Sequence, residues 1–133
     1  SGEDKTFRWW NAATGELLWL EREEQLDAVT ALSGSGPAYV FYFIEAMVQA
    51  GQDMGLSQPQ ALQLAKATFS GAASLAQQSS EAPGVLRERV TSKGGTTYAA
   101  LTSMQKDQVA EAFVRAMRAA GARAKELGDE FGG

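Results

Sequence analysis

The chain has 133 residues, of which 44% are hydrophobic and 21% are charged, and its formal net charge is −4 at pH 7. These proportions are typical of a folded globular protein, and the length allows one domain with its own core. Acidic and basic residues are mixed along the chain, so the basic stripe that binds a phosphate backbone is missing and no nucleic-acid partner is expected. The sequence contains neither Cys nor His, which removes disulfides, thiolate nucleophiles, imidazole bases and the usual zinc sites; we expect no metal.

No segment suggests insertion into a membrane. The most apolar run, residues 39–50, contains Glu45 and is shorter than the roughly 20 residues that a spanning helix needs. No charged and then apolar leader opens the chain, and the absence of Cys is compatible with a reducing compartment. We therefore expect a cytoplasmic protein that does not bind membranes.

Residues 1–21 form an atypical N-terminal segment, distinct from residues 22–133. Two runs rich in aromatic and aliphatic side chains, residues 6–10 and 17–20, favour strands, and the Asn and Gly between them favour a turn. The segment therefore predicts a short β-hairpin. It also holds all three tryptophans, Trp9, Trp10 and Trp19. Cross-strand aromatic packing is the commoner reason for such a cluster, and an aromatic binding platform is the alternative.

Residues 22–133 predict an all-α domain. After an acidic, helix-compatible stretch, two glycines and Pro37 interrupt the pattern, and a helix is expected over residues 38–54 with Ser33 or Ser35 as its cap. Apolar residues occupy nearly every face of this helix. Such a helix must be enclosed by other helices or by a second subunit.

The remaining helices are marked by caps and breakers. Gly55 is expected to end the long helix, and Ser57 with Gln60 has the spacing of a capping box at the start of the next. Three more helices are expected: a short one opening at Pro83, one over residues 96–104, and an amphipathic one over residues 107–127 that stops at Gly128.

The stretch Thr-Ser-Lys-Gly-Gly-Thr-Thr, residues 91–97, lies at one of these helix entrances. Backbone amides in the first turn of a helix lack partners, so Gly94, Gly95 and the neighbouring hydroxyl groups suit a carboxylate or a phosphate. The alternative is a capped helix start, in which Thr96 or Thr97 is the N-cap and the glycines only permit a tight turn.

Three segments together resemble the C-terminal domain of pyrroline-5-carboxylate reductase: DAVTALSGSGPAYVFYFIEAM, GAASLAQQSSEAPGVLRERVTSKGGTTYAAL and EAFVRAMRAAGARAKELG. The resemblance runs over about residues 15–127. The family makes L-proline by NAD(P)H-dependent reduction of 1-pyrroline-5-carboxylate. The resemblance implies a mainly α fold of the 6-phosphogluconate-dehydrogenase C-terminal-like type, which interlocks with a second copy into a homodimer or a higher homo-oligomer, and it would enclose the apolar helix at residues 38–54.

The resemblance also assigns the candidate site residues. In the family the loop holds the carboxylate of the pyrroline or of proline, which implies substrate-binding roles for Val90 as an apolar wall and for Ser92, Gly94, Gly95, Thr96 and Thr97. Thr97 would lie nearest the reacting imine and is the candidate catalytic residue. Ser33, Ser35 and Pro37 would approach the nicotinamide. Many members have proline where this chain has Lys93, whose charge would attract the carboxylate or lie in solvent.

The sequence contains no G-x-G-x-x-G fingerprint for a dinucleotide, and the Gly-Ser-Gly at residues 34–36 lacks the third glycine. NADPH or NADH would serve the parent enzyme, whereas no cofactor is expected to bind this chain alone, which we predict to be inactive by itself. The N-terminus departs from the family, so residues 6–10 are expected to pair with the strand at 17–21 in an engineered, truncated or rearranged chain. The alternative function is a purely structural oligomerisation module without a ligand.

Overall fold

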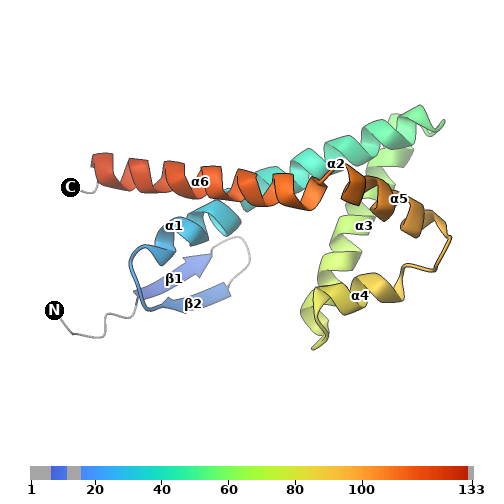
Figure 1. Ribbon diagram of the computed structural model, residues 1–133. Coiled ribbons are helices and arrows are strands. Elements are labelled where there is room, and N and C mark those ends of the chain that lie inside the picture. The colour runs from blue at the N-terminus through green and yellow to red at the C-terminus, as the bar shows by residue number, and fades with distance from the viewer. Residues whose placement is uncertain (1–6, 12–15, 132–133) are drawn as a thin grey trace. The chain divides into compact units, whose positions relative to one another are not determined.

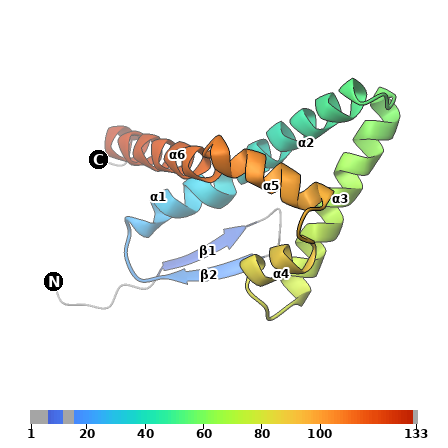
Figure 2. The same ribbon diagram turned by 45° about the vertical axis from the view of Figure 1, so that its right-hand side comes forward.

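A computed structural model describes residues 7–11 and 16–131. The chain divides into two compact units, one formed by residues 1–38 with 111–133 and the other by residues 39–110. The described part is mainly helical, as expected (Figures 1 and 2). Its elements are β1 (Phe7–Asn11), β2 (Glu16–Leu20), α1 (Gln25–Val29), the π-helix η1 (Thr30–Gly34), α2 (Gly36–Asp53), α3 (Gln58–Gln78), α4 (Pro83–Arg89), α5 (Thr96–Lys106) and α6 (Val109–Phe131).

Strands β1 and β2 pair antiparallel in the first unit, in a register that runs from Phe7 opposite Leu20 to Asn11 opposite Glu16. The turn of the expected hairpin, residues 12–15, lies outside the described residues, so the hairpin as a connected unit stays a prediction. The register places Leu17, Leu18 and Arg8 opposite the three tryptophans. No tryptophan lies directly across from another, but Trp10 and Trp19 occupy diagonal positions on the same face of the two strands. Cross-strand aromatic packing therefore stays a prediction.

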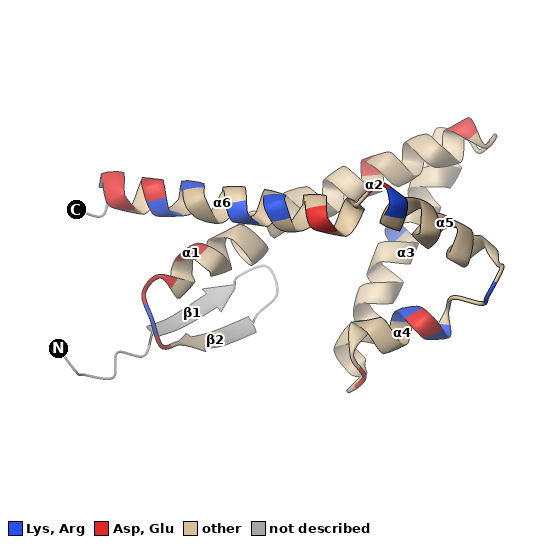
Figure 3. Ribbon diagram, in the orientation of Figure 1, with Lys and Arg blue, Asp and Glu red and all other residues tan. Residues whose placement is uncertain are grey.

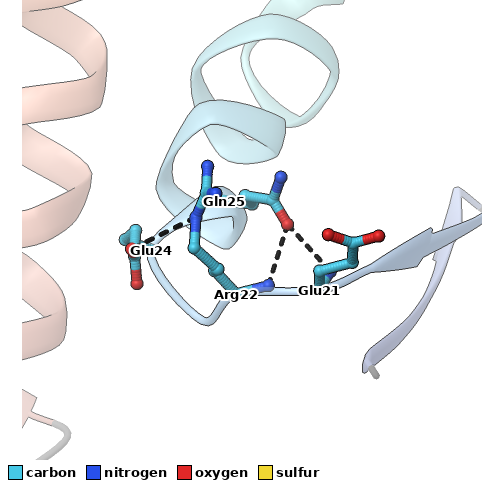
Figure 4. A network of polar contacts seen from close by, with 4 residues as sticks. All are labelled: Glu21, Arg22, Glu24 and Gln25. Carbon is cyan, nitrogen blue, oxygen red and sulfur yellow. Dashed lines mark hydrogen bonds and ion pairs between the residues drawn. The ribbon is translucent and has the colours of Figure 1, made fainter. Parts of the chain in front are cut away.

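A side-chain amide fixes the junction between β2 and α1. The Oε1 atom of Gln25 accepts hydrogen bonds from the backbone amides of Glu21, at 2.8 Å, and Arg22, at 2.9 Å (Figure 4). The Arg22 guanidinium lies 3.4 Å from the Glu24 carboxylate, and both side chains are well exposed. The junction is therefore held mainly by Gln25, because an exposed ion pair contributes little to stability.

The segment between α1 and α2 is a π-helix, which the sequence analysis did not anticipate. The Ser35 amide donates to the Thr30 carbonyl at 2.9 Å, and the Ser33 hydroxyl donates to the Val29 carbonyl at 3.0 Å. Of the two expected caps, Ser33 is ruled out because its hydroxyl bonds to Val29, and Ser35 is the residue that directly precedes α2. Ser35 accepts the Ala38 amide through its backbone carbonyl, at 3.1 Å. A wide turn here removes the clash that the ring of Pro37 would make with a continuous α-helix.

In the second unit, α2 and α3 form a helical hairpin that is closest at its turn and diverges away from it (Figures 1 and 2). Gly55 has a φ of 103° in the turn, a conformation that favours glycine. The Ser57 hydroxyl accepts the Gln60 amide at 3.2 Å and the Gln60 side chain accepts the Ser57 amide at 2.9 Å. The predicted capping box is confirmed.

The core of the second unit lies between these two helices. Val48, Ala61 and Ala65 are buried, and partly buried Ile44 and Leu62 pack against them. A Cβ atom built on Gly51 would lie 2.9 Å from the Ala61 Cβ atom, so glycine is required for this close approach. Small side chains therefore set how closely α2 and α3 pack.

Most of the apolar surface of α2 stays uncovered within the chain. Phe41 is 61% exposed and Tyr42 is 69% exposed. Charged residues are sparse on α2 and α3 compared with α4 and α6 (Figure 3). The expectation that α2 is apolar on nearly all faces is met, and the described residues leave much of this helix uncovered.

The boundary between α5 and α6 differs from the expected one. Gln108 has a φ of 55°, the one positive φ of a non-glycine residue among the described residues. Helix α6 then runs from Val109 to Phe131, so the prediction that Gly128 ends it is wrong. One glycine costs a helix only about 1 kcal/mol relative to alanine. A left-handed residue stops a helix, and that conformation occurs at Gln108 and not at Gly128.

Replacing Gln108 by glycine is expected to raise the free energy of unfolding by about 0.5–1 kcal/mol, because glycine adopts a left-handed conformation without the Cβ clash. Urea denaturation followed by circular dichroism measures the change. The control is Gln63→Gly inside α3, which is expected to lower stability by about 1 kcal/mol. A loss of stability in Gln108→Gly would contradict the left-handed conformation.

Candidate functional site

Helix α4 carries the chain into the candidate loop and is held at both ends. The Arg89 guanidinium reaches back to the Glu81 carboxylate at 2.8 Å, and the Ser79 hydroxyl accepts the Glu81 amide at 3.0 Å. At the other end the Thr91 hydroxyl donates to the Arg87 carbonyl at 2.5 Å. The Thr91 bond lies where the loop leaves the helix, whereas the Arg89–Glu81 pair is largely exposed and contributes less to stability. Sequence reasoning missed the ion pair between Arg89 and Glu81, which are eight residues apart. It also missed the hydrogen bond of Thr91, although a threonine hydroxyl often bonds to the backbone carbonyl four residues earlier.

The loop itself contains a tight turn from Ser92 to Gly95. The Gly95 amide donates to the Ser92 carbonyl at 3.0 Å, and Gly94, at the third position of the turn, has a φ of 77°. This is the arrangement of a type II turn, which favours glycine at that position. A Cβ atom on Gly95 would lie 2.6 Å from the Ser92 Oγ atom. The two glycines thus have different roles. Gly94 adopts the left-handed backbone conformation of the turn, and Gly95 leaves room for the Ser92 hydroxyl.

The entrance of α5 is open rather than capped. Its N-cap residue is Gly95, without a side-chain cap hydrogen bond, so the prediction that Thr96 or Thr97 caps the helix is wrong. The first backbone amide of α5 that donates a hydrogen bond is that of Ala99, which bonds to the Gly95 carbonyl at 3.1 Å. The amides of Thr96, Thr97 and Tyr98 make no hydrogen bond to the described residues. Three free donors at the positive end of a helix are the usual elements of a site for an anion.

The predicted substrate-binding residues all belong to the second unit, in one stretch of chain: Val90, Ser92, Gly94, Gly95, Thr96 and Thr97. The Thr97 side chain is half-buried, and those of Ser92 and Thr96 are exposed. Val90 is 69% exposed, so residues 7–11 and 16–131 do not enclose it as an apolar wall.

The residues predicted to face the nicotinamide, Ser33, Ser35 and Pro37, belong to the first unit. The structure therefore gathers the substrate loop as one site and places the three nicotinamide-side residues in the other compact unit.

Lys93 occupies the second position of the turn, where proline is common in type II turns. Its side chain is exposed, and neither its charge nor its amide has a partner among the described residues. Replacing Lys93 by proline is therefore expected to raise the free energy of unfolding by about 0.4–1 kcal/mol, because it restricts the unfolded chain.

Thermal or urea unfolding measures this difference, and Lys93→Ala serves as its control because alanine removes the charge without fixing φ. A destabilised Lys93→Pro variant would show that the backbone at residue 93 does not have the φ that proline requires.

Two further findings concern the whole described part of the chain. None of its helices is both long enough and apolar enough to cross a bilayer. Within residues 7–11 and 16–131, no three or more acidic side chains gather in a way that would hold a metal ion. The loop at residues 91–97 thus remains the candidate site, with backbone amides and hydroxyl groups as its chemistry.

Comparison with known proteins places these features in a family. Residues 23–127 match the family described as pyrroline-5-carboxylate reductase dimerisation. The chain is 46% identical over 121 residues to the pyrroline-5-carboxylate reductase of Pseudomonas aeruginosa, covering 91% of this chain and 44% of that protein. It is 44% identical over 115 residues to the Arabidopsis thaliana enzyme, covering 86% of this chain and 41% of that protein.

Solved structures agree with the sequence matches. The pyrroline-5-carboxylate reductase of Coxiella burnetii superposes with a TM-score of 0.78 at 41% identity, over 81% of this chain and 40% of that one. The Plasmodium falciparum reductase, solved with NADP bound, gives a TM-score of 0.77 at 34% identity, over 80% of this chain and 41% of that one. The chain thus spans about two fifths of the length of these relatives. With most of its length matched, the chain belongs to the pyrroline-5-carboxylate reductase dimerisation family.

Proposed function

We propose that this chain is the dimerisation and substrate-loop part of a pyrroline-5-carboxylate reductase, which acts in L-proline synthesis. The observation that carries the proposal is the open entrance of α5 within the matched region, where three free amides lie behind a turn bordered by Ser92. A small carboxylate suits this arrangement, since its oxygens accept several hydrogen bonds at once.

In the proposed reaction the loop binds and orients the substrate. The amides of Thr96 and Thr97 and the Ser92 hydroxyl would hold the carboxylate, and the half-buried Thr97 hydroxyl would lie toward the imine nitrogen and supply or relay its proton. The nicotinamide supplies the hydride to the C=N carbon.

This site is expected to be incomplete in the 133-residue chain, because the sequence contains no dinucleotide fingerprint. NADPH or NADH would bind the parent enzyme, and we expect no reduction of 1-pyrroline-5-carboxylate by this chain alone. A cytoplasmic location stays a prediction.

The test of the loop is a titration of the 15N-labelled protein with L-proline, followed by residue-resolved amide shifts. Saturable shifts at residues 92–98 are expected, and Gly95→Ala should weaken binding by about tenfold or more, since its methyl group displaces the Ser92 hydroxyl. The matched control is Gly84→Ala in α4, where a Cβ atom meets nothing within 4 Å. If L-proline left the amide shifts of the unsubstituted 133-residue chain unchanged, the loop assignment would be refuted. The alternative, a purely structural oligomerisation module, would then be favoured.

We also propose that the chain forms a homodimer or a higher homo-oligomer. The exposed aromatic side chains of α2, including Phe41 and Tyr42, support this, because a soluble monomer rarely leaves so many large apolar residues of one helix uncovered. Sedimentation equilibrium over a range of protein concentrations tests it. A mass of twice the chain or more is expected, and a folded monomer at all concentrations would refute the assembly while leaving the loop assignment open to its own test.

A further inference from the structure

A hollow of about 230 Å³ lies between α4 and α5, beside the candidate loop and within the second unit. One face of α5 lines it with Tyr98, Leu101 and Gln105, which are three or four residues apart and therefore share a helix face. The end of α4 completes the wall with Arg87 and Glu88. A hollow of this size has room for a small molecule rather than for a nucleotide.

The charges at this hollow differ from the other charges of α4. Arg89 is paired with Glu81, whereas Arg87 and Glu88 form no ion pair with any described residue. Arg87 and Glu88 are successive residues of α4, and both line the hollow. The hollow thus carries a free cation and a free anion at the same edge.

The other lining groups suit the body of a small polar ligand. Leu101 is half-buried and gives an apolar floor, and the Tyr98 hydroxyl and the Gln105 amide both donate and accept hydrogen bonds. The Thr91 hydroxyl, which also lines the hollow, is engaged with the Arg87 carbonyl.

We propose that the hollow between α4 and α5 is a second binding site, for a small zwitterion of the α-amino acid type. The ligand carboxylate meets Arg87 and its ammonium group meets Glu88, while the carbon between them lies over Leu101. The site differs from the candidate substrate loop in its donors, which are side chains rather than the free amides of α5. It recognises both charges of the ligand, whereas the loop recognises a carboxylate alone.

The experiment is an amide-shift titration of the 133-residue protein with glycine, in comparison with acetate and methylammonium, which each carry one of its two charges. Glycine is expected to give saturable shifts at residues 87–91 and 98–105. Acetate and methylammonium are each expected to bind about tenfold more weakly than glycine, because each loses one charge-assisted hydrogen bond. Arg87→Gln and Glu88→Gln are each expected to cause a similar loss. Arg115→Gln in α6, outside the second unit, is the control for the change of net charge.

Gly95→Ala separates the two sites, because it disrupts the loop and leaves the charges of the hollow in place. Glycine binding that persists in Gly95→Ala and falls in Arg87→Gln supports the second site, even if the loop proves not to bind proline. Equal binding of acetate and glycine, an unchanged affinity in Arg87→Gln, loss of binding in Gly95→Ala, or no saturable shift with glycine would each overturn it.

Discussion

Replacing Gly51 by valine is expected to lower the free energy of unfolding by about 2–3 kcal/mol, the upper part of the range for overpacked cores. A Cβ atom at this position lies 2.9 Å from the Ala61 Cβ atom and 3.5 Å from a Leu56 methyl carbon. Ala61 is 3% exposed and its Cβ atom is fixed to the backbone of α3, so no flexible side chain yields to the added methyl groups. The helices themselves must move apart, which opens the core around Ala65.

Urea denaturation at one fixed protein concentration measures this change, because the stability of an oligomer depends on concentration. The matched control is Gly71→Ala in α3, where a Cβ atom meets nothing within 4 Å. It is expected to gain about 0.5–1 kcal/mol from the better helix propensity of alanine. If Gly51→Val were as stable as the parent chain, α2 and α3 would not approach each other as closely as the structure shows.

Local signals predicted the helices where side chain and backbone act within a few residues. The capping box of Ser57 and Gln60 predicted the start of α3, and Pro83 predicted the start of α4. Both signals depend only on residues within one helical turn. The prediction that α6 ends at Gly128 was wrong, because glycine allows a helix to end but does not force it to end. The π-helix before Pro37 and the left-handed Gln108 had no signal in composition or periodicity, since both depend on how two consecutive helices join.

The local geometry of the candidate loop was predicted in part, and its role as a binding site stays a prediction. The residue types at 92–97 indicate an anion at a helix entrance, and the structure agrees that this entrance lacks a side-chain cap. The sequence could not tell which glycine supplies the left-handed turn and which gives room to Ser92, because the two are adjacent and chemically identical. It also could not reveal the ion pair between Glu81, which precedes α4, and Arg89, which is the last residue of that helix.

The second large effect is expected from Phe41→Glu, which should weaken self-association by about 100-fold or more. Phe41 is 61% exposed in the single chain, on a helix whose sequence is apolar on nearly all faces. In the proposed oligomer a second chain covers this ring, which contributes about 1.5–3 kcal/mol, and a buried carboxylate adds a further cost.

Sedimentation equilibrium of the variant is expected to show dissociation at concentrations where the parent chain stays associated. Phe41→Leu is the control, because it keeps an apolar side chain and should leave most of the association in place. Circular dichroism must show that Phe41→Glu keeps its helices, which is expected because the side chain lies outside the buried cluster of Val48, Ala61 and Ala65. An unchanged mass for Phe41→Glu would mean that a second chain does not cover this part of α2, and the interface would then have to lie on other apolar residues of the chain.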